Sequence, residues 1–261
     1  MPVETSLNIA ALVSVGQHPV SGRARRADQD ARAVELGLTL AGRSLSLVHV
    51  GDAGEPALRQ YLGMGLHTMT VLQEAPEADA VQPLLQYFAT HPADIVLAGV
   101  QAERGEASGL LPYLLAERLG WPLVPRIAQI RAIENGRAEV LQALPRGQRR
   151  ALTVPLPFIA TVDSAAPGAR QTAFGPGQRG LFDIQRGVAQ PDVARAEWME
   201  TQARPRPKRL NVVKAKSAAE RFKAATAKPQ GQGGQVMKQE SSREKAQAIF
   251  DLLVAEGVIR Q

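Results

Sequence analysis

The residues best placed to do chemistry lie in the segment 94–109, where an apolar run ends in glycines and a serine. Ile95–Ala98 has the composition of a buried strand, and Gly99 follows it at a point where backbone can approach a ligand closely. The amides of residues 107–109 precede an expected helix, so they lie at the positive end of its dipole. The pattern predicts a nucleotide-phosphate site.

Polar side chains beside this site allow more than one role. Ser108 is suited to contact a phosphate or to cap the helix, and one hydroxyl can do both. Gln101 either contacts an adenine or ribose or satisfies the backbone of its own loop. Arg104 supplies a cation for an anionic ligand. Glu103 and Glu106 lie near the helix start, where acids favour the dipole without any catalytic role.

The composition predicts one large domain with an appendage. The chain has 261 residues, of which 44% are hydrophobic, enough for a sizeable core. It has no cysteine, which excludes disulfides and thiolate chemistry and fits a reducing compartment. No run approaches the roughly 20 apolar residues of a membrane span, so we expect a cytoplasmic protein without membrane insertion.

The formal charge of +6 comes mainly from the stretch Arg204–Lys228, which holds nine Lys or Arg residues against one acid, Glu220. Such a stretch either wraps a partner or binds nucleic acid. Phe222 is its only aromatic residue, and stacking on single strands requires more. We therefore expect a partner-wrapping arm and no nucleic-acid binding.

Apolar strands and amphipathic helices alternate along the first half of the chain. This order predicts an α/β fold, a Rossmann-like doubly wound parallel sheet. The expected strands are Leu7–Val15, Leu45–Val50, His67–Leu72 and Ile95–Ala98, and the expected helices are Ala27–Leu40, Glu55–Leu62, Asp79–Ala89 and Pro112–Leu119. Ligands in such sheets bind beyond the carboxyl ends of the strands, where the segment 94–109 lies.

Later segments predict an antiparallel extension with a hairpin turn at Asn135-Gly136, and then a loop over Gly168–Gly180. An extended C-terminal arm leads to an amphipathic helix over Ser242–Glu256. We therefore divide the chain into an α/β domain, 1–192, and a basic arm, 193–261.

The four histidines are scattered without ligand spacing, so we expect no metal site. No Ser-His-Asp or lysine-centred arrangement is present. We expect no catalytic residues.

Several motifs together resemble the beta subunit of electron transfer flavoproteins, over most of the chain. The family has an LLGKQA-like turn, a WP pair, an LRTALAMG-like segment, an LPAVVTTD-like strand and a similar last segment. The matching residues here are Leu97–Ala102, Trp121-Pro122, Leu58–Gly65, Leu156–Asp163 and Gly233–Val236.

The resemblance implies a non-catalytic electron carrier, the partner of a larger alpha subunit. FAD would lie at the interface, mainly in the alpha subunit, and AMP would be a structural nucleotide in this chain. Electrons would pass from a flavin-linked dehydrogenase towards a quinone oxidoreductase. FAD in the AMP site, or no nucleotide there, remain alternatives.

Site residues follow from the motif positions. Ser14 and Val50 match positions near the adenosine, although both also suit packing. The predicted cofactor-binding residues are Ser14, Val50, Gly99, Gln101, Arg104, Glu106, Ala107, Ser108 and Gly109. Arg170 and Phe174 lie in a stretch similar to an RYATLP-like recognition loop, within 165–182, and would bind the dehydrogenase. An aromatic residue here either anchors a partner or folds back onto its own domain.

Two departures from the family mark this chain as divergent. Arg25-Arg26-Ala27 replaces an NPF-like turn, after a shortened connection over Gly16–Arg26. Arg104–Gly109 replaces consecutive aspartates followed by Asn-Gln-Thr. The alternative functions are an adenine-nucleotide enzyme of the ATP-pyrophosphatase-like superfold and a nucleic-acid-binding protein. The former requires an SGGxDS-like loop, which Val15–His18 does not supply.

Overall fold

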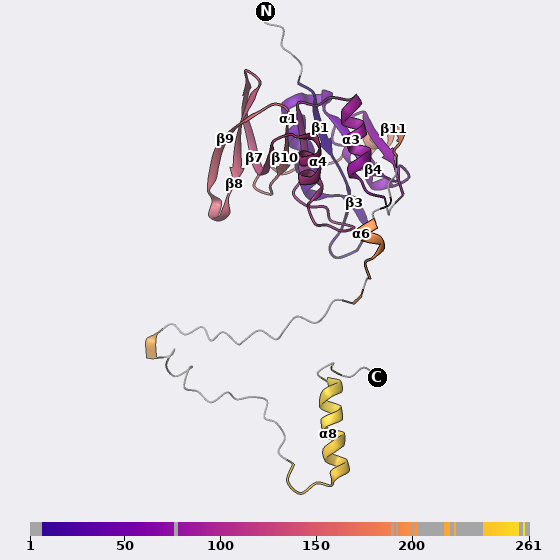
Figure 1. Cartoon of the computed structure of the whole chain (residues 1–261), viewed down its shortest axis with the longest axis vertical. Coiled ribbons are helices and arrows are strands. Elements are labelled where there is room, and N and C mark those ends of the chain that lie inside the picture. Colours follow the sequence, from indigo (N-terminus) through magenta and orange to yellow (C-terminus); the bar gives the residue numbers. More distant parts are fainter. Residues whose placement is uncertain are drawn as a thin grey trace, which may run out of the picture. The chain divides into compact units, whose positions relative to one another are not determined.

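The computed structural model describes residues 7–75, 78–188, 191, 193–199, 201–202, 217–219, 222, 237–255 and 258 (Figure 1). The chain divides into two compact units, residues 1–200 and 201–261.

A nine-stranded sheet forms the centre of the first unit, in the order β11-β5-β4-β1-β6-β10-β7-β8-β9. Its parallel strands are β1 (Ile9–Leu12), β4 (Ser46–Gly51), β5 (Thr68–Gln73), β6 (Ile95–Gly99), β10 (Phe158–Val162), β11 (Leu181–Arg186) and β7 (Leu123–Glu134). The strands β8 (Arg137–Ala143) and β9 (Arg149–Pro155) continue it antiparallel from β7. The predicted parallel α/β sheet with an antiparallel extension is confirmed.

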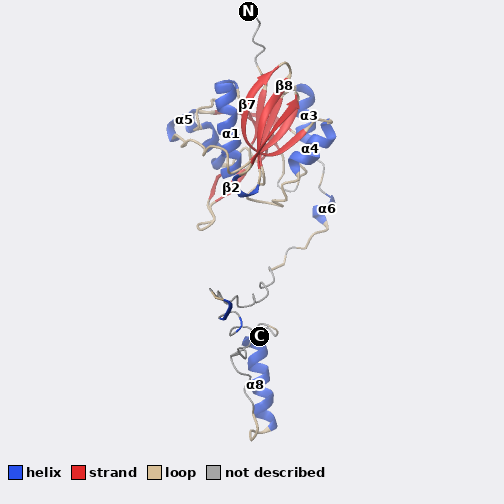
Figure 2. Cartoon of the chain, turned by 90° about the vertical axis from the view of Figure 1, so that its left-hand side faces the viewer, coloured by secondary structure: helices blue, strands red, loops and turns tan. Residues whose placement is uncertain are grey.

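Helices cover both faces of the sheet, with α1 on one side and α3 and α4 on the other (Figure 2). The helical segments of this unit are α1 (Asp28–Ala41), η1 (Gly42–Ser44), η2 (Pro56–Leu58), α2 (Arg59–Leu62), α3 (Val81–Thr90), α4 (Leu111–Leu119), η3 (Pro145–Gly147), α5 (Phe174–Arg179) and α6 (Val193–Ala196). Because β4 and β6 lie on opposite sides of β1, the direction of winding reverses between β1 and β6. Ligands of doubly wound sheets bind at such a reversal.

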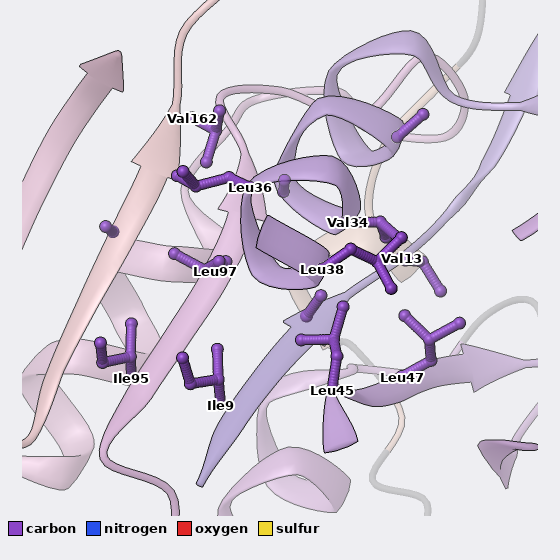
Figure 3. Close-up of a cluster of buried hydrophobic side chains, with 14 of the residues drawn as sticks. Ile9, Val13, Val34, Leu36, Leu38, Leu45, Leu47, Ile95, Leu97 and Val162 are labelled. Carbon is purple, nitrogen blue, oxygen red and sulfur yellow. The ribbon is translucent and has the colours of Figure 1, made fainter. Parts of the chain in front are cut away.

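The core consists of two apolar layers, one against each face of the sheet. Side chains of α1 pack on alternate residues of the central strands, as Leu36 does near Leu97 and Val34 near Val13 (Figure 3). The opposite layer joins the helices α3 and α4 to the other face of the same strands. Both faces are therefore buried, which is why the central strands are continuously apolar.

Three elements differ from the sequence-based expectation. A short hairpin, β2 (Val15–Gln17) with β3 (Ala24–Arg26), fills the connection between β1 and α1. A two-turn helix, α5, occupies part of the expected loop 168–180. The edge strand β11 was not expected at all. It pairs with one neighbour only, and most of its side chains are exposed, so it lacks the apolar pattern of a buried strand.

The turn at Asn135-Gly136 is confirmed between β7 and β8. Asn135 has φ +51 and Gly136 φ +70, the two left-handed positions of a tight hairpin turn that these residue types favour.

In the second unit, the described part of the C-terminal segment contains the helix α8 (Ser242–Ala255). It begins with a capping box, because Ser241 and Glu244 bond to each other's backbone N–H groups. Ile249 and Leu252 are exposed on it. Most of the basic stretch Arg204–Lys228 and the motif Gly233–Val236 lie outside the described residues.

The buried phenol of Tyr61 joins α2 to the end of β1 and to the start of α1. The hydroxyl of Tyr61 donates to the Ser14 carbonyl at 2.8 Å and accepts the Ala27 N–H at 2.8 Å. Both Tyr61 and Ala27 are fully buried.

We predict that Tyr61→Phe lowers the free energy of unfolding by about 1 to 3 kcal/mol, because it leaves the buried Ala27 N–H without a partner. Urea denaturation measures this change. Tyr113→Phe, on the exposed face of α4, is the control, and equal midpoints for both variants would contradict the prediction.

Candidate functional site

A cavity of about 310 Å³ lies at the carboxyl ends of β1 and β6, where the winding of the sheet reverses. Eight of the nine predicted cofactor-binding residues line it: Ser14, Gly99, Gln101, Arg104, Glu106, Ala107, Ser108 and Gly109. Val50 does not. It is half-buried in β4 and packs against the apolar layer beneath α3 and α4. The structure thus gathers residues from two distant segments around one crevice.

The loop 100–110 lines the crevice and has an irregular backbone. Gly105, Ala107 and Gly109 all have positive φ, at +72, +53 and +74. Within the described part of the chain, the backbone N–H groups of residues 107–109 form no hydrogen bond. Unpaired amides with left-handed residues between them are suited to bind an anion.

Ser108 acts in this structure as a turn residue. Its hydroxyl accepts the N–H of Leu110 at 3.2 Å, just before α4 begins at Leu111. The helix therefore starts two residues after Gly109, not directly at it. Pro112 at the second helical position has no N–H, so the free amides available for a ligand come from the loop.

Gly99 is packed against α1 so closely that no side chain fits. A Cβ at this position would lie 2.3 Å from an Asp30 oxygen. Its N–H donates to Asp30 Oδ1 at 3.1 Å, and the next amide, Val100, donates to the side chain of Gln29 at 2.9 Å. The first turn of α1 therefore fixes the backbone where β6 ends.

Asp30 also holds the end of β1. Its Oδ2 accepts the Ser14 N–H at 2.8 Å and the Ser14 hydroxyl at 2.5 Å. Burial raises the pKa of Asp30 to about 6, and the hydrogen bonds from Ser14 and Gly99 oppose the shift. Three donors offset only part of the cost of removing a carboxylate from water.

Two other buried groups hold the same strand end. His49 contacts the Val13 carbonyl through Nδ1 at 2.8 Å, which places the proton on that nitrogen. Burial lowers the pKa of His49, while the contact with Val13 raises it in part. Burial also raises the pKa of Tyr61 well above its ordinary value. Both side chains are therefore neutral at pH 7 and serve as polar supports.

The other predicted side chains have local partners. Gln101 donates to the Ala107 carbonyl, so its amide stabilises the loop backbone, the second of its two expected roles. Arg104 forms a long ion pair with Glu55 at 3.7 Å and is half-exposed. Glu106 is exposed at the rim. Ligand binding by these residues stays a prediction.

The loop that contains Arg170 and Phe174 is fastened to α1 and α2. Arg170 binds Glu35 through its backbone N–H at 3.0 Å and through two guanidinium nitrogens at 2.8 and 2.9 Å. The Thr172 hydroxyl donates to the Gln60 carbonyl at 2.7 Å. Phe174 is 81% exposed and does not fold back onto its own domain. Arg170 thus anchors the loop that presents Phe174.

Comparison with known proteins places the chain in a family. The family model for the electron transfer flavoprotein domain matches residues 20–180. A curated electron transfer flavoprotein subunit beta from Chromohalobacter salexigens is 50% identical over 258 residues, 98% of this chain and 97% of that protein.

The chain belongs to the electron transfer flavoprotein beta subunit family. A putative electron transfer flavoprotein subunit of Escherichia coli is 31% identical over 109 residues, 38% of this chain and 41% of that protein. The resemblance that the motifs indicated is therefore confirmed.

Sequence reasoning missed Asp30 in this flavoprotein subunit and did not foresee the contacts of Glu103, which it had described only as an acid near a helix start. Asp30 lies on the apolar stripe of α1 with Ala27, Ala31 and Val34, where an acid is out of place, and that position was the available signal. Glu103 had no comparable signal, because all three of its partners lie at least 75 residues away in the chain.

No helix within the described residues is long and apolar enough to cross a membrane. The same part of the chain holds no group of three metal-ligating side chains.

We predict a specific pH dependence from Asp30 in this electron transfer flavoprotein subunit. Its pKa is raised from 3.8 unfolded to about 6 folded. The folded state therefore favours the protonated acid, and this contribution is complete below pH 4 and lost as the pH rises through 6. The loss amounts to about 3 kcal/mol.

Asp30→Asn lacks this term, so its unfolding free energy relative to wild type should rise by about 2 to 3 kcal/mol between pH 4 and pH 7. Urea denaturation at both pH values measures the difference. Asp28→Asn, an exposed carboxylate in the same helical turn, controls for the removal of a negative charge. If the difference in unfolding free energy between Asp30→Asn and wild type did not change with pH, the raised pKa of Asp30 would be ruled out.

Proposed function

We propose that this chain is the beta subunit of a heterodimeric electron transfer flavoprotein, an electron carrier without catalytic residues of its own. The observation that carries the proposal is the 50% identity with a beta subunit over 98% of the chain. Its partner is an alpha subunit, which holds most of the contacts to FAD at the interface. Because the chain has no cysteine, FAD supplies the redox chemistry when bound.

The crevice fits a mononucleotide, and we assign AMP to it. The free amides of residues 107–109 and the half-exposed cation of Arg104 suit a phosphate. Gly99 brings bare backbone to the cavity wall, and Ser14 lies across from it at the end of β1. A cavity of about 310 Å³ is at the small end for a ligand site, which favours AMP over FAD here.

Electrons enter from a flavin-linked dehydrogenase and leave towards a quinone oxidoreductase. The dehydrogenase docks on the loop 165–182, where Phe174 is the exposed apolar anchor. We place the exchange in the cytoplasm, because a chain without cysteine suits a reducing compartment. The basic stretch 204–228 wraps the alpha subunit in this proposal and does not bind nucleic acid.

We predict that the purified protein releases AMP on denaturation, identified by its mass, and is yellow from one FAD per heterodimer. Arg104→Ala should weaken AMP binding about five- to tenfold, because one charge-assisted contact is lost. Calorimetry on nucleotide-free protein measures the affinity. Arg118→Ala, an exposed arginine on α4, should leave it unchanged. Release of FAD alone from the crevice, or no released nucleotide, would overturn the AMP assignment.

Phe174→Ala should slow reduction by the dehydrogenase about tenfold or more, because a fully buried aromatic anchor contributes 2 kcal/mol or more to an interface. FAD content should not change, because in this proposal Phe174 contacts the dehydrogenase and the alpha subunit holds most of the contacts to FAD. Stopped-flow reduction at limiting dehydrogenase measures the rate.

Ile184→Ala is the matched control, because it removes an exposed apolar side chain, 57% accessible, from the edge strand β11 outside the loop. Equal reduction rates in wild type and Phe174→Ala would exclude the anchor.

A further inference from the structure

Glu103 joins the crevice loop to the hairpin β2–β3 and to the start of α1. Its Oε1 accepts the Asp28 N–H at 2.8 Å and an Arg25 guanidinium nitrogen at 3.0 Å, and its Oε2 accepts the Gln17 N–H at 2.9 Å. The side chain is 22% exposed. One carboxylate thus binds three donors from two elements that are at least 75 residues away in the chain.

These contacts are selective for a carboxylate at this position. Two oxygens are needed to reach donors on both sides, and the negative charge is favoured by both Arg25 and the positive end of α1. Gly16 leaves space for this carboxylate, because a Cβ at position 16 would lie 2.7 Å from Glu103 Oε2. Within the described part of the chain, Glu103 is the crevice-loop residue that hydrogen-bonds to the hairpin.

The hairpin in turn contacts the partner-binding loop. The guanidinium of Arg26 donates to the Arg170 carbonyl at 2.7 Å, and its backbone N–H donates to the Gln60 side chain at 3.0 Å. The carbonyl of Gln60 accepts the Thr172 hydroxyl. Hydrogen bonds, joined through the backbone of Arg25-Arg26 and through Gln60, therefore connect Glu103 to Arg170 and Thr172, just before Phe174.

We propose that Glu103 couples the nucleotide crevice to the partner-binding loop, so that a phosphate bound at residues 104–109 also orders the hairpin and the loop 170–174. The proposal rests on the proposed function, since it takes AMP as the ligand and this loop as the docking site. A phosphate that fixes the backbone next to Glu103 reduces the entropy lost when its side chain holds three donors. The nucleotide then regulates how well Phe174 is presented.

Hydrogen exchange on the full-length protein, in the subunit state in which it purifies, tests the coupling. AMP should slow exchange of the hairpin amides, including Gln17, of the Asp28 amide at the start of α1, and of the loop 170–174 by about five- to tenfold, the size of a typical coupling. In Glu103→Ala, saturating AMP should still protect residues 104–109 but no longer the hairpin or the loop 170–174.

Two further variants make the test specific. Glu103→Gln keeps an acceptor of the same shape without the charge, so it should restore part of the protection. Glu139→Ala removes another glutamate paired with an arginine, at 3.3 Å from Arg131 but on the exposed β7–β8 hairpin, and should behave as wild type.

Calorimetry separates failure of the coupling from failure of the AMP assignment. Wild-type protein that binds AMP without protection of the loop 170–174 would overturn the coupling alone, as would full protection in Glu103→Ala. Wild-type protein that binds no AMP would overturn the nucleotide assignment and, with it, the regulatory role.

Discussion

The crevice depends on one buried carboxylate at the start of α1. Asp30 accepts amides from the ends of β1 and β6 at once, which fixes the ends of the two strands between which the winding of the sheet reverses. A neutral group would hold these amides less strongly, and an exposed carboxylate could not reach both. The raised pKa of Asp30 shows that burial costs more than its three donors return. Such a cost is expected where a site must be rigid before its ligand binds.

The sheet could be predicted because its central strands are buried on both faces and separated by amphipathic helices, a pattern that is local in the sequence. The Asn135-Gly136 turn could also be predicted, because both residue types tolerate the positive φ that a tight hairpin turn requires. The edge strand β11 could not be predicted from the sequence. Its pairing with β5 depends on a strand more than 100 residues earlier, and exposed side chains such as Leu181 and Ile184 give no alternation to detect.

The crevice was predicted in part for the same reason. Glycines and a serine after a buried strand identify the loop 100–110, and eight of the nine residues named from it and from the strand ends line one cavity. The side chains that hold this loop act across long sequence separations, 69 residues from Asp30 to Gly99 and 86 from Gln17 to Glu103. No local sequence pattern indicates hydrogen-bonded pairs so far apart in the chain. Polar networks of this kind become visible only when the fold has placed their members together.

Glu103, the residue just before the altered loop 104–109, contacts Arg25 of the other altered segment. An acid next to an anion site would ordinarily repel a phosphate, yet the charge of Glu103 is taken up by Arg25 and two amides. Arg104, by contrast, is held only loosely by Glu55 at 3.7 Å, so it remains available to turn towards a ligand. Arg25 of the altered segment therefore neutralises the acid that precedes the altered loop, so Glu103 does not compete with a phosphate for Arg104.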